Sequence, residues 1–212
     1  MNNLIKLDGP IVSASEETKY LVIFLHGWGS DGNDLIQLAD YCKRELSNAT
    51  FLAPNGPEVC SENPSGRQWF EIGQTTNITK FAQLDQSFLA LEGYIENKLE
   101  KYNLPINNYF LLGFSQGTML SIYYAIRKKC LGVIGYSGAF IEHKLPKKIE
   151  KNDFLLMHGE KDNIVPIEKL YEANVKLLEL SNNVIYKTYS NLEHSINEEG
   201  LIEGMSFIKN RI

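Results

Sequence analysis

Ser115 is the residue of this sequence best placed to act as a nucleophile. It stands in the segment GFSQG (residues 113–117), after an apolar run and before a stretch with helical character. In a sharp strand-to-helix turn, flanking glycines avoid clashes, and free N–H groups at the helix start lie beside the hydroxyl. The pattern therefore predicts a nucleophilic serine. The alternative is a tight turn in which the serine caps the helix.

A serine hydroxyl needs a base to remove its proton, and the chain has 4 histidines. Where strands and helices alternate, the order along the chain is expected to be serine, acid, histidine. His26 precedes the serine, His143 lies in an irregular stretch, and His158 ends a strand. His194, in SNLEHSINEE, follows the last predicted strand and precedes the last helix, so it is the predicted base. The alternative is a solvent-exposed loop histidine.

The acid that orients the histidine should follow the preceding strand on the same edge of the sheet. Asp162 meets this condition in MHGEKDNIVP (residues 157–166). Asp153 is at the wrong end of its strand, and Glu160 is too close to the strand end. Glu193 would point away from the histidine ring. Asp162 is therefore the predicted acid, with capping of the next helix as the alternative.

Acyl transfer also needs two N–H donors for the oxyanion. One should be the N–H of Gln116, the residue after the nucleophile. The other should come from LHGWGSDG (residues 25–32), here called the first loop, where small residues let the backbone approach. The predicted donor is the N–H of Trp28, whose side chain is also placed to line the acyl pocket. His26 is predicted to brace this loop rather than to act in catalysis.

The elements that must position these residues alternate between short apolar runs and amphipathic segments. This alternation predicts a mostly parallel sheet with helices on both faces, and sites at the carboxyl ends of its strands. Residues 4–13 are predicted to form an antiparallel edge strand. The stretches 58–79 and 139–152 are predicted to be irregular. The predicted strands are 20–27, 49–57, 108–114, 131–138, 153–159 and 183–190, and the predicted helices are 34–46, 81–102, 116–129, 166–181 and 197–212.

Length and composition limit the class of protein. The 212 residues suit a single domain over 1–212, and the net charge of −5 argues against nucleic acid or an anionic membrane as the main partner. Cys42, Cys60 and Cys130 are widely spaced and odd in number, which predicts neither a disulfide framework nor a zinc site. Cys42 and Cys130 are expected to be buried thiols. The start lacks the features of a signal peptide, and no early apolar run is long enough to span a membrane, so we expect a cytoplasmic protein without integral membrane association.

From Tyr20 onward, the chain resembles the serine-hydrolase family that groups bacterial carboxylesterases, phospholipase/carboxylesterases and acyl-protein thioesterases. The resemblance implies an α/β-hydrolase fold, a triad of Ser115, Asp162 and His194, and N–H donors at Trp28 and Gln116. It implies no cofactor and is compatible with a homodimer. The matching stretches are FLHGWGSDGNDL, APNGP, RQWFEI, LLGFSQG, GYSGAF, LLMHGEKDNIVP and EHSINEE.

The sequence departs from the family pattern at a few positions. The family often has leucine at the position of Trp28, so the acyl site is expected to be narrower here. It often has a second glycine at the position of Thr118, which the helix should tolerate, and a glycine at the position of Glu193, so the loop before the histidine is expected to differ in shape. Residues 58–81 resemble the segment that covers the site in this family and are called the covering segment. Within it, Trp69 and Phe70 resemble part of an acyl groove; the alternative is local core packing of two aromatic rings.

These residues together favour a carboxylesterase that cleaves short- to medium-chain esters or thioesters through an acyl-serine. Its partner would be a small-molecule acyl ester or thioester, and no metal is expected. One alternative is an acyl-protein thioesterase or lysophospholipase that acts on long acyl chains. Another is a non-catalytic binding protein with a hydrolase fold, of which a missing triad residue would be the sign.

Overall fold

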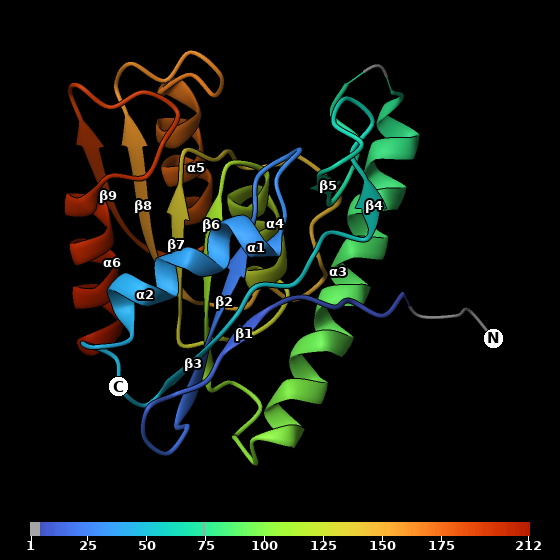
Figure 1. Cartoon of the computed structure of the whole chain (residues 1–212). Helices are drawn as coiled ribbons and strands as arrows, with labels where there is room; N and C mark the ends of the chain where they lie inside the picture. Colours follow the sequence, from blue (N-terminus) through green and yellow to red (C-terminus); the bar gives the residue numbers. More distant parts are fainter. Residues whose placement is uncertain (1–4, 74) are drawn as a thin grey trace.

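A seven-stranded sheet forms the centre of the part of the chain that the structure, a computed structural model, describes: residues 5–73 and 75–212. Its strand order is β1-β3-β2-β6-β7-β8-β9, with β1 antiparallel to β3 and every other neighbouring pair parallel. The arrowheads of the central strands therefore meet at one end of the sheet (Figure 1). The strands are β1 (Ile11–Val12), β2 (Tyr20–Leu25), β3 (Ala49–Leu52), β6 (Tyr109–Phe114), β7 (Gly132–Tyr136), β8 (Asp153–Gly159) and β9 (Asn183–Tyr189).

The central strands are uninterrupted apolar runs because helices cover both faces of the sheet. In β2, all six residues are buried, and alternate side chains enter different clusters. Leu21, Ile23 and Leu25 join one core cluster, whereas Val22 and Phe24 join the other. This period of two, with apolar side chains on both faces, is what a strand in the middle layer of three requires.

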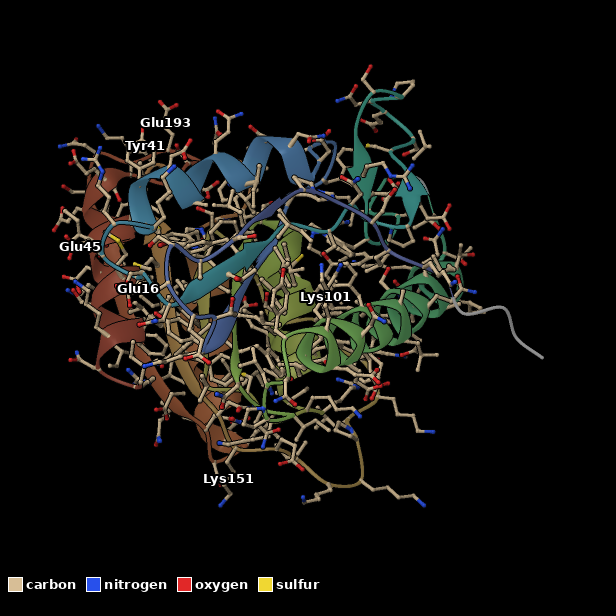
Figure 2. All side chains as sticks on the ribbon, turned by 60° about the horizontal axis from the view of Figure 1, so that its bottom comes forward. Glu16, Tyr41, Glu45, Lys101, Lys151 and Glu193 are labelled. Carbon is tan, nitrogen blue, oxygen red and sulfur yellow. The ribbon has the colours of Figure 1, made fainter. Side chains whose placement is uncertain are left out.

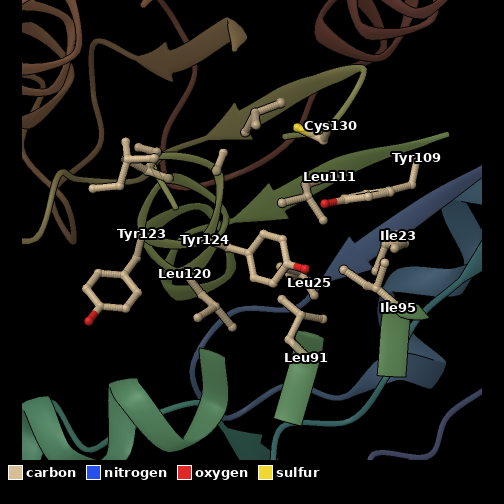
Figure 3. Packing of buried hydrophobic residues seen from close by; sticks show 14 of the residues in the cluster. Ile23, Leu25, Leu91, Ile95, Tyr109, Leu111, Leu120, Tyr123, Tyr124 and Cys130 are labelled. Carbon is tan, nitrogen blue, oxygen red and sulfur yellow. The ribbon is translucent and has the colours of Figure 1, made fainter. Parts of the chain in front are cut away.

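The helices divide between these two clusters. Residues of α3 (Asn77–Lys101), α4 (Gln116–Ala125) and α5 (Glu168–Glu179) pack in the first cluster. Figure 3 shows Leu91 and Ile95 of α3 and Leu120 of α4 meeting side chains of the sheet there. The second cluster receives residues of α1 (Gly32–Leu35), α2 (Ala39–Cys42) and α6 (Glu198–Lys209). Charged side chains such as Glu16, Glu45, Lys101, Lys151 and Glu193 lie on the outside (Figure 2).

The sheet and most helices confirm the predicted pattern, with shifted ends. The helix predicted at 81–102 begins earlier, at Asn77, because the Thr76 side chain accepts a hydrogen bond from the Thr79 N–H and caps it. The helix predicted at 116–129 ends at Ala125. The strand predicted at 49–57 ends at Leu52, and the residues after it form a loop.

Two predictions about local structure were wrong. The helix predicted at 34–46 is a run of short pieces, α1, the 3₁₀ helix η1 (Ile36–Leu38) and α2, which ends at Cys42. In the stretch 58–79, predicted to be irregular, β4 (Glu58–Val59) and β5 (Arg67–Gln68) form an antiparallel hairpin. The predicted edge strand at 4–13 is confirmed only over Ile11–Val12, and its residue Leu4 lies outside the described residues.

Candidate active site

Ser115 lies in a strained turn between the end of β6 and the start of α4. Its φ of 53° and ψ of −115° are rare for a residue with a side chain and cost about 1–3 kcal/mol. A Cβ atom at Gly113 would lie 2.4 Å from the Thr118 nitrogen, and one at Gly117 would lie 1.8 Å from the Leu25 oxygen. The side chain of Ser115 makes no helix-capping hydrogen bond, so the capping alternative does not hold.

Asp162 and His194 meet across the carboxyl ends of β8 and β9. The Nδ1 atom of His194 lies 2.7 Å from Oδ2 of Asp162, while Oδ1 of Asp162 accepts hydrogen bonds from the N–H groups of Ile164 and Val165. Burial alone would raise the pKa of Asp162, but the hydrogen bonds from His194 and these N–H groups outweigh it and lower the pKa. Asp162 is therefore an ionised carboxylate that orients the His194 ring.

His194 lies beside the turn that contains Ser115. The rings of Phe114 and His194 are 4.8 Å apart between centroids, and Phe114 immediately precedes Ser115. His194 is partly exposed, and Ser115 is 9% exposed. Among the described residues, a hydrogen bond joins Asp162 to His194, and none involves the serine hydroxyl.

The first loop runs along the other side of the serine. A Cβ atom at Gly27 would lie 3.5 Å from Cβ of Ser115, which places the next peptide group, that of Trp28, beside the nucleophile. Within the described ranges, neither the Trp28 N–H nor the Gln116 N–H has a hydrogen-bond acceptor. Two free N–H groups at this position are what an oxyanion would need.

His26 braces the first loop, as the sequence predicted. Its Nε2 atom accepts a hydrogen bond from the Gly56 N–H at 2.8 Å, and its Nδ1 atom lies 2.8 Å from the Gly27 carbonyl oxygen. These partners assign the proton to Nδ1. Burial lowers the pKa of His26, so the ring is neutral and holds two loops together.

Trp69 and Phe70 of the covering segment are fully buried. The Trp69 indole donates to the His26 carbonyl oxygen at 3.0 Å, and the two rings lie 5.1 Å apart between centroids. Neither aromatic side chain offers surface to a ligand. The alternative of local core packing therefore describes them, and the predicted lining of an acyl groove by these rings is corrected.

The side chain of Gln116 has a part that the sequence did not reveal. Its Oε1 atom accepts a hydrogen bond from the Trp69 N–H at 2.9 Å, and its Nε2 atom donates to the Phe70 carbonyl oxygen at 2.6 Å. Gln116 is fully buried. The residue after Ser115 thus binds the covering segment through its side chain. In the sequence, the position of Gln116 directly after Ser115 was the only signal for this role of its side chain.

His158, rejected as a base from the sequence, supports the acid instead. Its Nε2 atom lies 2.7 Å from the Val165 carbonyl oxygen and 3.3 Å from Oδ2 of Asp162. Its Nδ1 atom is buried and has no partner among the described residues. Burial lowers the pKa of His158, so the ring is neutral; its Nε2–H donates to the Val165 carbonyl oxygen and lies beside the Asp162 carboxylate. Its position four residues before Asp162 was the available signal.

The other rejected candidates lie elsewhere, as expected. His143 stacks on Phe81 at 4.1 Å between centroids. Asp153 binds Arg211 through a 2.9 Å contact between Oδ2 and Nε, and Glu193 is exposed. In the described part of the chain, no group of three His, Cys, Asp or Glu side chains is arranged to hold a metal ion. The helices of that part include none with the length and apolar character of a membrane span.

Comparison with known proteins identifies the family. The Phospholipase/Carboxylesterase family matches residues 8–212, so the chain belongs to this family and its fold is that of the α/β hydrolases. Esterase PE8 has a crystal structure with a TM-score of 0.90, 31% sequence identity and coverage of 98% of this chain and 100% of its own.

Relatives named for different substrates are about equally similar to this chain. Carboxylesterase SOBER1 of Arabidopsis thaliana is 28% identical over 209 residues, which cover 90% of each chain. Acyl-protein thioesterase 1 of Candida albicans is 26% identical over 223 residues, covering 94% of this chain and 95% of the relative. Carboxylesterases and acyl-protein thioesterases therefore both occur among relatives of similar identity.

Proposed function

We propose that this protein is a serine hydrolase that cleaves carboxylic esters or thioesters through an acyl-serine intermediate. The observation that carries the proposal is the 2.7 Å hydrogen bond between Asp162 and His194, beside the strained turn that presents Ser115. A carboxylate that holds an imidazole beside a serine in such a turn is the arrangement of nucleophilic acyl transfer. Membership of the family supports the same chemistry.

In the proposed reaction, His194 takes the proton from Ser115 as the serine oxygen attacks the acyl carbonyl carbon. Asp162 stabilises the imidazolium, and the N–H groups of Trp28 and Gln116 donate to the oxyanion. The imidazolium then gives its proton to the leaving alcohol or thiol. A water molecule, deprotonated by the same histidine, attacks the acyl-serine. The imidazolium returns this proton to the Ser115 oxygen as the acid leaves, which restores the starting state.

The proposed substrates are small acyl esters or thioesters of short to medium chain length. The relatives' names include both carboxylesterase and acyl-protein thioesterase, so a thioester is within the proposal. Action on long acyl chains, as an acyl-protein thioesterase or lysophospholipase, is the alternative. The single domain, the cytoplasmic location and the homodimer stay predictions from the sequence.

The test is turnover of p-nitrophenyl butyrate together with labelling by a fluorophosphonate, which reacts with activated serines. Replacing the nucleophile of such a triad lowers kcat by about 10⁶-fold, so Ser115→Ala should lose both turnover and labelling. Ser206→Ala, a matched change at an exposed serine of α6, should keep both. Equal turnover by wild type and Ser115→Ala would contradict the proposal, and a wild type that stays unlabelled would favour a binding protein.

A further inference from the structure

Trp28 carries a large side chain that no step of the proposed reaction uses. Its N–H is the proposed oxyanion donor, but its indole extends away from that peptide group. The preceding residue, Gly27, abuts Ser115, with 3.5 Å between its built Cβ position and the serine Cβ. The residue is only half-buried, so part of its side chain is open to a ligand.

A hydrogen bond fixes the far end of this indole. Its Nε1 atom donates to Oε1 of Gln68 at 2.7 Å. Gln68 is 3% exposed, and its Nε2 atom donates in turn to Oε2 of Glu71 at 3.2 Å. Oε1 of Glu71 accepts the Gly73 N–H at 2.8 Å. The Ser61 N–H also donates to Oε1 of Gln68, at 3.3 Å. Rotating the indole outward would break the shorter of these two bonds, so the bond holds the ring in place.

The backbone beneath the indole is equally constrained. The Gly29 N–H donates to the Arg67 carbonyl oxygen at 3.0 Å, and the Arg67 N–H donates to the Ser30 carbonyl oxygen at 2.8 Å. The side chain of Asn63 donates to the Gly29 carbonyl oxygen at 2.7 Å. The first loop and the covering segment are thus hydrogen-bonded into one unit. The indole cannot make room for a ligand by a movement of its own loop alone.

Trp69 and Phe70 of the covering segment offer no second aromatic surface beside this indole, because both are fully buried. The amide of Gln116 binds the backbone at both residues. An acyl chain leaving Ser115 on this side therefore meets a large ring that is hydrogen-bonded in place.

We propose that Trp28 is a specificity-determining residue. Its fixed indole limits the acyl side of the site, so that the enzyme selects acyl groups of acetyl to butyryl size over octanoyl and longer ones. This inference rests on the proposed function, and it names the substrate class of the same site. Gln68 is the positioning residue that keeps the ring in place.

The test compares kcat/KM for p-nitrophenyl butyrate and p-nitrophenyl octanoate. Wild type should prefer the butyrate. In Trp28→Leu, the ratio of octanoate to butyrate kcat/KM should rise by about tenfold or more, since a few methylene groups of pocket space are worth that much selectivity. Gln68→Met keeps the indole and removes its acceptor, so the ratio should rise by a smaller factor. Tyr41→Leu, a matched change at an exposed aromatic residue of α2, should leave the ratio unchanged.

The outcomes separate this inference from the proposed function. If Trp28→Leu lowers kcat/KM equally for both esters, or if wild type prefers the octanoate, the inference is overturned and the hydrolase remains. If wild type and Ser115→Ala do not differ in turnover, the proposed function fails and the inference fails with it. Should Trp28→Leu not fold, Trp28→Phe and Gln68→Met decide, because both release the ring from its acceptor. An unchanged ratio in both would overturn the inference.

Discussion

Two groups of residues flank Ser115, and they are built in different ways. On the acid–base side, Asp162 and His194 follow the ends of β8 and β9, and His158 lies near the end of β8; both histidines contact the Asp162 carboxylate. The covering side consists of the first loop and the covering segment. There the contacts are mostly between neutral amides and backbone groups, such as the bond from the Gly29 N–H to the Arg67 carbonyl oxygen.

The two sides should therefore contribute differently to the proposed reaction: one through protonation, the other through the positions of peptide groups. A change on the acid–base side alters protonation and tautomer while the strands that carry the residues stay in place. A change on the covering side alters no titration in the proposed reaction, but it moves the peptide groups that would bind the oxyanion and the acyl chain. The two sides should therefore differ both in the size of the rate loss and in which constants change.

Asp162→Asn should produce the largest effect short of removing the nucleophile. An amide would favour the wrong tautomer of His194, and kcat should fall by about 10⁴-fold while the fold persists. Asp153→Asn, at the opposite end of β8, is the matched control and should keep wild-type kcat. Steady-state kinetics with circular dichroism melts check this. A kcat within tenfold of wild type for Asp162→Asn would show that the two sides do not differ as described.

Gln116→Met should produce the next largest effect, and through geometry alone. The variant keeps the N–H of residue 116 but releases the backbone of Trp69 and Phe70, so kcat should fall by about 10- to 100-fold. Gln116→Glu keeps an acceptor for the Trp69 N–H and should lose less. Gln37→Met, at an exposed glutamine, should have wild-type kcat. If Gln116→Met and Gln116→Glu were both as active as wild type, the side chain would have no positioning role.

Each side also holds one buried neutral histidine, His26 on the covering side and His158 on the acid–base side. Burial lowers both pKa values, so below pH 6.5 the unfolded chain binds protons that the folded protein does not. The free energy of unfolding should therefore fall with falling pH, by up to about 1.4 kcal/mol per pH unit for each histidine. Urea unfolding between pH 7 and 5 should show a shallower pH dependence for His158→Asn and for His26→Asn than for wild type. An unchanged slope in both variants would contradict this assignment.

Ser87→Ala should produce the smallest effect. The Ser87 hydroxyl donates to the Trp69 carbonyl oxygen, and both residues are fully buried, so its loss should cost about 1–2 kcal/mol of unfolding free energy. The exposed Ser206→Ala serves as the control. Thermal and urea unfolding check the difference. A loss no larger than that of the control would mean that the covering segment does not depend on this bond.

The acid–base side was predictable because topology restricts it. Once alternating elements predict a parallel sheet, the residues after consecutive strands must share one edge, and few polar residues occupy those positions. Asp162 and His194 were selected in this way, and their hydrogen bond confirms that the two meet. Whether Ser115 completes a catalytic triad with them stays a prediction.

The covering side was not predictable by the same reasoning. Its hairpin has strands of two residues each, too short for any periodicity, and its hydrogen bonds join residues far apart in the chain. An aromatic pair such as Trp69 and Phe70 has the same sequence pattern whether it lines a groove or packs in the core. The prediction of one helix over 34–46 was wrong for a related reason. The same apolar spacing also fits a series of short helical turns, and these end at Cys42.

The chain contains 2 tryptophans, and both belong to the covering side. Trp28 is half-buried against Gln68, whereas Trp69 is fully enclosed. Light of a wavelength that only indoles absorb would therefore excite this side of the nucleophile and nothing else in the molecule. A shift of the fluorescence emission wavelength on adding an acyl compound would report on Trp28. Iodide should quench the half-buried Trp28 and not the enclosed Trp69. The protein thus carries a built-in optical reporter at the place where its selectivity is proposed to reside.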